Sequence, residues 1–230
     1  MKDMIMNTPA MLVLTLGSYL LGVWVKKKSG LSLLHPFLIS LPIIIAVLTF
    51  MDIPYDFYME SNTLIDFMLG PSVVALGFLL YEKRRVILDN VVGIASAVVS
   101  GSVVGVGSVY LLYRVCRLDE IFFRSLEAKS VTTPIAMDIT ATLGGNLSLT
   151  AVSVILSGFL GALFGPAVLK LLRINSPVAK GLALGCSSHG MGTAKAIEIG
   201  SIEGALSGLS IALMGVVTAL IIPIFNFFLL

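Results

Sequence analysis

Long apolar runs alternate with short polar segments along the whole chain. Six of the runs are long enough to cross a bilayer, because a helix needs about 20 apolar residues to span a roughly 30 Å hydrocarbon core. The pattern therefore predicts an all-α integral membrane protein with about six full transmembrane helices. We expect them at residues 8–25, 33–51, 62–81, 89–113, 147–172 and 204–228.

Two further segments, residues 121–145 and 176–200, are too polar and too interrupted to be ordinary spans. Each precedes a long apolar helix, so we predict two broken or re-entrant helical segments arranged as an inverted pair. Such pairs build the midplane substrate sites of secondary transporters. Two topologies remain open, since each segment either dips into the membrane and returns or crosses it fully as a broken helix.

The basic residues set the expected orientation. Clusters at residues 26–28 and 83–85 follow the first and third predicted helices, and the positive-inside rule places both in the cytoplasm. In the re-entrant topology, the segment at 121–145 then enters from outside and the segment at 176–200 from inside. We expect helices for scaffolding and dimerisation in residues 1–118 and transport helices in residues 119–230.

Composition supports this class and argues against others. The chain is 57% hydrophobic and 12% charged, with a mean hydropathy of +1.02, which excludes a soluble domain and leaves the lipid bilayer as its solvent. A net charge of +2 carried in loops offers no surface for nucleic acid. Cys116, Cys186, His35 and His189 lack metal-ligand spacing. We therefore expect no metal, no cofactor and no enzyme activity.

The first polar break contains residues suited to starting a helix inside the membrane. Ser130, Thr132 and Thr133 can each cap a helix N-terminus, and Pro134 favours the first turn. A half-helix beginning near Thr133 or Pro134 would present free N–H groups and a positive dipole end, and Lys129 would add a full charge. The alternative is a kinked helix whose threonine hydroxyls bond its own carbonyls.

The second break offers similar chemistry with other residues. Ser187 and Ser188 can cap a helix, whereas Gly190 and Gly192 permit unwound backbone. Thr193 then stands on the following half-helix. We predict that the backbone N–H groups and hydroxyl groups of this break lie at the same depth in the membrane as those of the first break.

Charged and titratable residues accompany both breaks. Lys195 precedes Glu198 by three residues, so a local ion pair is possible. His189 has an ordinary pKa of about 6.5 and could carry a proton during transport, or it could remain a hydrogen-bond partner that never changes charge. Asp138 and Glu198 are further candidates for ion or proton coupling.

Hydroxyl groups, two helix N-termini and two lysines at one depth suit a small anion, most simply a carboxylate. A cation site would instead need converging carbonyls and carboxylates, and a lipid site would need an apolar cavity. The expected substrate-binding residues are Lys129, Ser130, Thr132, Thr133, Ser187, Ser188, His189, Thr193 and Lys195.

The residues of the two breaks also carry a family resemblance. The stretches Lys129-Ser-Val-Thr-Thr-Pro-Ile-Ala-Met137 and Ser188-His-Gly-Met-Gly-Thr-Ala-Lys-Ala196 resemble the signature segments of the LrgB/CidB family. The resemblance extends over nearly the whole chain. Two departures are Ala128, where the family usually has proline, and His35-Pro36, where Asn-Pro is common.

The resemblance implies two hypotheses. Bacterial members are holin-like or antiholin-like regulators of murein hydrolase activity and autolysis that act with a small LrgA/CidA-type membrane partner. Other members are linked to pyruvate uptake, and a plastid relative exchanges glycolate for glycerate. The chain would then be a multi-pass protein of the bacterial cell (inner) membrane, and a secondary transporter of pyruvate, lactate, glycolate or glycerate type is the hypothesis that agrees with the anion site.

We expect the protein to form a dimer. Small residues spaced four apart are relevant to this expectation, because they allow two helices to approach closely. Pairs at Gly101/Gly105, Gly161/Gly165 and Gly204/Gly208 could drive self-association or pack helices within one chain. The helix at 89–113 also carries several serines beside its glycines. That side serves close packing or, alternatively, a hydrated path along the serines.

Overall fold

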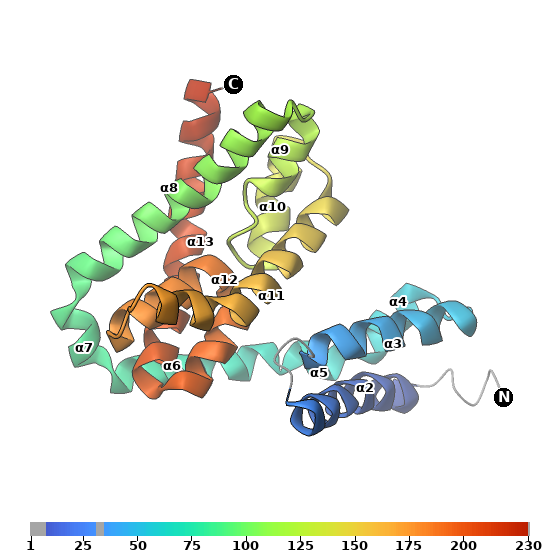
Figure 1. Ribbon diagram of the computed structural model, residues 1–230. Helices are drawn as coiled ribbons and strands as arrows, with labels where there is room; N and C mark the ends of the chain where they lie inside the picture. Colours follow the sequence, from blue (N-terminus) through green and yellow to red (C-terminus); the bar gives the residue numbers. More distant parts are fainter. Residues whose placement is uncertain (1–7, 31–34, 230) are drawn as a thin grey trace. The chain divides into compact units, whose positions relative to one another are not determined.

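The computed structural model describes residues 8–30 and 35–229, which are largely helical and contain no strand (Figure 1). The all-α prediction is confirmed. The helices are α2 (Thr8–Ser29), α3 (Pro36–Phe50), α4 (Tyr55–Ser61), α5 (Thr63–Phe67), α6 (Leu69–Glu82), α7 (Arg84–Asp89), α8 (Val91–Cys116), α9 (Glu120–Leu126), α10 (Thr133–Leu143), α11 (Leu147–Leu171), α12 (Pro177–Ile199) and α13 (Ser201–Leu229).

Five helices in the described part are long and apolar enough to cross a membrane, and they cover five of the six predicted spans. The sixth, predicted at 33–51, is the shorter α3, whose 15 residues reach about 22 Å. Pro36 begins this helix, and Asp52 with a φ of 52° follows its end. The predicted start at Leu33 lies outside the described residues.

The chain divides into two compact units, residues 1–75 and 76–230, with the boundary inside α6. In the first unit, α2 packs against α3 and α4. Gly22 makes the close approach possible, since a Cβ there would lie 2.6 Å from the Pro36 carbonyl oxygen. Thr15 Oγ1 donates to Asn62 Oδ1 (2.9 Å) and lies 2.8 Å from the Tyr58 hydroxyl. This polar cluster ties α2 to the α4 region.

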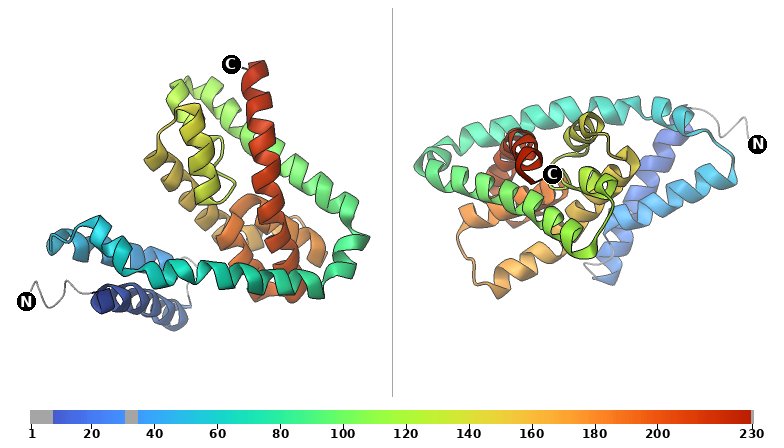
Figure 2. Two further views of the ribbon diagram at one scale, coloured as in Figure 1. Left: turned by 180° about the vertical axis from the view of Figure 1, so that it is seen from behind. Right: turned by 90° about the horizontal axis from the view of Figure 1, so that it is seen from above.

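The second unit is framed by three long helices, α8, α11 and α13, and its core lies between them (Figures 1 and 2). Val98 and Val106 of α8, Val154 of α11 and Ile222 of α13 are almost completely buried. Polar side chains also join two of the helices, because Thr218 Oγ1 on α13 donates to the Ser102 hydroxyl on α8 (3.0 Å). The frame holds two folded-back segments, which occupy the positions of the predicted breaks.

Hairpin A comprises residues 120–143, that is α9, a connecting turn and α10. Hydrogen bonds hold its two ends together: Arg124 Nη1 donates to the Leu143 carbonyl oxygen (2.5 Å), and the Asn146 N–H donates to Ser125 Oγ (2.8 Å). The segment therefore begins and ends on the same side of the unit.

Hairpin B comprises residues 177–199, the two halves of α12. The halves meet at His189, whose φ of 38° and ψ of −126° turn the chain back. Gly192 then packs so closely on Leu184 that a Cβ would overlap the Leu184 carbonyl oxygen. At the base, Ile199 shares a cavity of about 270 Å³ with residues from the end of α11 and the start of α12.

Both predicted breaks thus have the folded-back geometry that the re-entrant topology requires. Hairpin B packs along the first half of α13, where Gly204 meets Ile197. Hairpin A packs along the second half, where Gly215 meets Ile135 and Asn226 meets Glu127. The two segments therefore occupy opposite halves of α13, as members of an inverted pair would (Figure 1).

Candidate functional site

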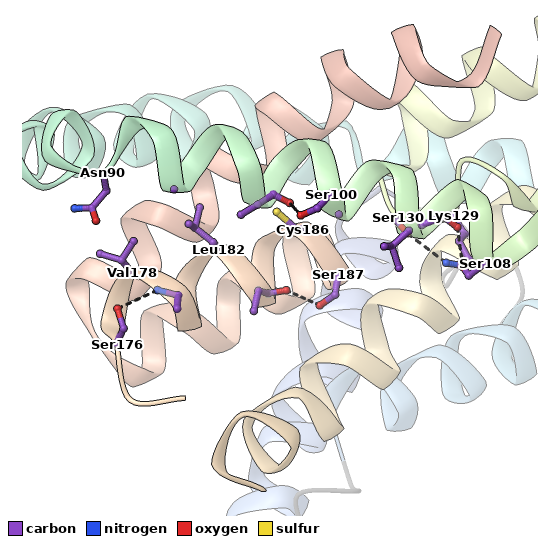
Figure 3. A pocket seen from close by; sticks show the side chains of 17 residues that line it. Asn90, Ser100, Ser108, Lys129, Ser130, Ser176, Val178, Leu182, Cys186 and Ser187 are labelled. Carbon is purple, nitrogen blue, oxygen red and sulfur yellow. Dashed lines mark hydrogen bonds between the residues drawn. The ribbon is translucent and has the colours of Figure 1, made fainter. Parts of the chain in front are cut away.

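A cavity of about 660 Å³ lies between α8 and the first half of α12, and the turn of hairpin A reaches one end of it (Figure 3). Its lining is made mostly of glycine, alanine and serine, with a few larger apolar side chains. The small residues leave the space open, and the serines supply hydroxyl groups. A polar ligand a few carbon atoms long fits this volume and lining.

The tips of the two hairpins meet α8 at consecutive helical turns. A Cβ at Gly101 would lie 3.3 Å from Cys186 Cβ of hairpin B, and one at Gly105 would lie 3.2 Å from Ser130 Oγ of hairpin A. Four residues of helix correspond to about 6 Å. The glycines of α8 therefore bring residues more than fifty positions apart in sequence to one cavity.

Lys129 supplies the charge of the site. Among the described residues that line the cavity it is the one ionisable to a cation or anion at neutral pH, and its Nζ donates to Ser130 Oγ (3.3 Å). A lysine ammonium has three donors, so it can bind a further acceptor. Ion pairs among the described residues include Lys83–Glu82, Arg124–Glu120 and Lys195–Glu198. Since Lys129 belongs to none of them, its charge is available to an anion in the cavity.

Ser187 supplies the hydroxyl group that hairpin B contributes to the cavity lining. It lines the cavity, donates to the Ala183 carbonyl oxygen (2.7 Å) and lies 2.8 Å from Ser188 Oγ. Figure 3 shows Ser187 on one segment, with Lys129 and Ser130 on another, along the same cavity. Of the nine predicted binding residues, these three are the ones that the cavity brings together.

Two other predicted residues begin α10 as the sequence indicates. Thr132 is the N-cap and Thr133 the first helical residue, with Pro134 next to it. The Thr132 side chain makes no capping hydrogen bond, so this N-terminus is less completely satisfied than expected. Neither threonine lines the cavity.

Three predicted binding residues of hairpin B make contacts within the protein and do not line the cavity. His189 Nε2 lies 3.0 Å from the Val154 carbonyl oxygen, and Thr193 Oγ1 lies 2.7 Å from Ser207 Oγ. Ser188 is completely buried, where Gly161 of α11 makes room for it. These contacts fix the turn of hairpin B against α11 and α13.

The expected meeting of two lysines does not occur at this cavity. Because the chain turns back at His189, Lys195 lies on the return arm, where its Nζ pairs with Glu198 Oε2 at 2.6 Å. The predicted local ion pair is therefore present, but away from the cavity lining. Asp138 is exposed on α10, also outside the lining.

Several lining residues were not among the predicted site residues. They include Asn90, Ser100, Ser108 and Ser176. The signal for Ser100 and Ser108 was the serine-containing face of the predicted helix at 89–113, where a hydrated path was the alternative to close packing. In the structure Gly101 packs closely on Cys186, and Ser100 lines the cavity beside it.

The fold and the cavity together define a class, a multi-pass helical membrane protein in which two folded-back segments surround a cationic cavity. The family model of the LrgB-like family matches residues 15–228, and the chain belongs to this family. The resemblance in the two polar breaks is thereby confirmed.

Similar proteins occur in Bacillus subtilis (strain 168). The "Uncharacterized protein YxaC" is 37% identical over 213 residues, which is 93% of each chain. The "Antiholin-like protein LrgB" is 32% identical over 215 residues, again 93% of each chain. The "Uncharacterized protein YwbG" is 36% identical over 188 residues, 82% of this chain and 84% of that protein. No solved structure matches the chain.

Proposed function

We propose that this LrgB-type membrane protein is a secondary transporter of small monocarboxylates, of pyruvate, lactate, glycolate or glycerate type. The observation that carries the proposal is Lys129, the charged lining residue of a cavity bounded by both hairpins. A carboxylate accepts charge-assisted hydrogen bonds from an ammonium group, and these are stronger than neutral ones. Ser130 and Ser187 would donate to its remaining lone pairs.

The proposed mechanism is alternating access. A transported anion must reach the same site from each side in turn, and segments that enter from opposite sides can serve as separate gates. The cavity opens between α8 and hairpin B, while the turn of hairpin A covers its Lys129 end. Movement of hairpin A relative to α8 and α13 would expose the same lysine to the other side.

We place the protein in the bacterial cell (inner) membrane and expect it to act as a homodimer, with a small LrgA/CidA-type membrane protein as a further partner. Lipid is the expected neighbour of the outward faces of α8 and α13, where large apolar side chains such as Val92 and Phe227 are more than four-fifths exposed. Such side chains suit a hydrocarbon environment.

A holin-like or antiholin-like regulator of autolysis is the second candidate, and the name of the relative LrgB from Bacillus subtilis favours it. The glycine pairs that could drive pore-forming self-association are used inside the chain. Each glycine packs against another residue of the same chain: Gly101 against Cys186, Gly105 against Ser130, Gly161 against Ser188, Gly165 against Leu184, Gly204 against Ile197 and Gly208 against Leu76. These pairs therefore give the second candidate no support.

Counterflow of labelled monocarboxylates in proteoliposomes tests the proposal. Purified protein should exchange internal unlabelled pyruvate for external labelled pyruvate in a saturable manner, while an entrapped dye stays inside. Empty liposomes and a labelled small cation serve as controls. Release of the dye together with every small solute would contradict transport and favour a holin-like lesion, and the assay is repeated with the LrgA/CidA-type partner added.

A further inference from the structure

Glu127, in the turn of hairpin A, is a buried carboxyl group that the binding cavity does not use. Its side chain is 1% exposed, and Oε1 accepts a hydrogen bond from Asn226 Nδ2 of α13 (3.4 Å). Glu127 Oε2 and Asn226 Oδ1 are both buried without a hydrogen-bond partner. Two acceptor oxygens of one contacting pair of residues are thus left without a donor.

A proton on Glu127 removes this conflict. An ionised carboxylate only accepts hydrogen bonds, whereas a protonated carboxyl group gains an O–H donor. A buried charge without full hydrogen bonding is strongly disfavoured relative to its neutral form. The site therefore favours neutral Glu127, with an O–H available to an acceptor such as Asn226 Oδ1.

Among the described residues, no cation forms an ion pair with Glu127. Arg124, one turn earlier, is held by Glu120 and by the Leu143 carbonyl oxygen. Ala128 and Val131, in the same turn as Glu127, are buried in the apolar core. The charged or polar groups that act on Glu127 are Arg124 on α9 and Asn226 on α13, and Lys129 lies two residues away in the same turn. Tyr110 and Tyr113 of α8 pack on Phe123, one turn before Glu127, with ring centroids 5.9 and 5.3 Å from its ring.

We propose that Glu127 and Asn226 form a buried proton-binding site that couples proton movement to the movement of the carboxylate. The inference rests on the proposed function and adds its coupling ion. Lys129 follows Glu127 by two residues, so their Cα atoms lie at most about 7 Å apart. An anion bound at Lys129 is repelled by ionised Glu127 and not by neutral Glu127.

Proton and anion therefore bind together. By linkage, protonation tightens anion binding by the same factor by which the anion tightens proton binding, on the order of tenfold for charges at this range. One proton and one monocarboxylate add no net charge, so the loaded site crosses the membrane without electrical work. Hairpin A carries both groups in a single turn, and its movement would carry both across.

Proton uptake during substrate binding tests the coupling directly. Purified wild-type protein in weakly buffered detergent solution is mixed with pyruvate, and a pH dye reports the protons taken up per substrate bound. At alkaline pH, where the carboxyl group of the substrate-free site is partly ionised, we expect up to about one proton per pyruvate, and binding should weaken as pH rises. Glu127→Gln keeps the shape and removes the titration, so it should bind pyruvate without proton uptake. Asp138→Asn, an exposed carboxyl group on the same hairpin, is the matched control and should resemble wild type.

Transport gives a second readout. In proteoliposomes, an inward proton gradient should drive pyruvate accumulation by wild type and Asp138→Asn, whereas Glu127→Gln should retain counterflow and lose gradient-driven accumulation. Accumulation by Glu127→Gln equal to wild type would overturn the inference. So would accumulation driven by a sodium gradient and indifferent to pH.

A substrate-free measurement separates this inference from the proposed function. Infrared spectra at neutral pH should show the carbonyl stretch of a buried, protonated carboxyl group in wild type and Asp138→Asn, and Glu127→Gln should lack it. If wild type binds no monocarboxylate, the proposed function and the coupling both fail, and the carbonyl band still decides whether Glu127 holds a proton. A spectrum unchanged by Glu127→Gln would overturn the proton site itself.

Discussion

Hairpins A and B are both folded-back segments, but different kinds of contact stabilise them. Hairpin A is charged, and two side-chain hydrogen bonds join its ends, one donated by Arg124 to the Leu143 carbonyl oxygen and one accepted by Ser125 from the Asn146 N–H. Hairpin B is rich in glycine, and it is held by close approaches of backbone, at Gly181 to Glu203 and at Gly185 to Ser207, together with the hydrogen bonds of His189 and Thr193. Hairpin A brings the charge of Lys129 and the Ser130 hydroxyl to the cavity, whereas hairpin B contributes the Ser187 hydroxyl and a packed wall.

The difference shows that the two lysines of the polar breaks are not equivalent. Lys129 sits in the turn of hairpin A on the cavity, and Lys195 sits on the return arm of hairpin B with Glu198 as its partner. An inverted pair can thus place its ligand charge asymmetrically. Each prediction below sets a residue of one hairpin against a matched control.

The largest expected effect is on transport by Lys129→Met. Loss of a charge-assisted contact to the carboxylate costs about 3 kcal/mol, or on the order of 100-fold in counterflow rate at low substrate. Lys195→Met loses only a partly exposed ion pair and should fall by about twofold. The rates are compared at equal amounts of inserted protein. Equal losses in both variants would show that the asymmetry is wrong.

Stability should separate two glycines of hairpin B. Gly192→Ala forces a methyl group into Leu184 and Ser188, and we expect a loss of about 2 to 4 kcal/mol in the free energy of unfolding. Gly190 has open space around its Cβ position, so Gly190→Ala should change stability by less than about 1 kcal/mol. Thermal unfolding in detergent measures both. Similar melting of the two variants would contradict the fold-back at His189.

Hairpin A should loosen at its base when Arg124 is replaced. Arg124→Gln removes the donor to the Leu143 carbonyl oxygen, with an expected cost of about 1 to 2 kcal/mol. Hydrogen exchange of the amides at residues 143–146 should accelerate, while exchange in hairpin B stays unchanged. Arg114→Gln, at an exposed position of α8, is the control and should leave both regions as in wild type.

The smallest expected effects come from the hydroxyl groups of the cavity. Ser130→Ala and Ser187→Ala each remove one neutral hydrogen bond to the substrate, worth about 1 kcal/mol, or roughly fivefold in apparent affinity. Ser96→Ala, on the exposed face of α8 and outside the lining, should have no effect. Substrate titrations of counterflow provide the comparison. An effect of Ser96→Ala as large as that of the cavity serines would place the site elsewhere.

Features set by nearby residues were predictable from the sequence. Hydropathy located five spans and both polar breaks, and the Thr132-Thr133-Pro134 sequence located the start of α10. The Lys195–Glu198 pair was also predictable, because residues three apart on a helix are neighbours. In each case the interaction lies within one or two helical turns.

Which residues line the cavity depends on packing between segments far apart in the sequence, so the lining was harder to predict. The sharp turn of hairpin B falls at His189, whose φ of 38° is unusual for a residue with a side chain, rather than at a neighbouring glycine. That turn decides that Ser187 lines the cavity and Lys195 does not. Glu127 and Asn226 are 99 positions apart, so no local pattern could have paired them.

The central claim is that a monocarboxylate occupies the cavity beside Lys129, and protection of a thiol tests it most directly. Ser187→Cys is introduced into a chain whose two native cysteines, Cys116 and Cys186, are replaced by serine. Modification of the new thiol by a small neutral reagent should slow with increasing pyruvate, saturably, and this protection should disappear when Lys129→Met is added. A modification rate that no concentration of any tested monocarboxylate changes would contradict the account.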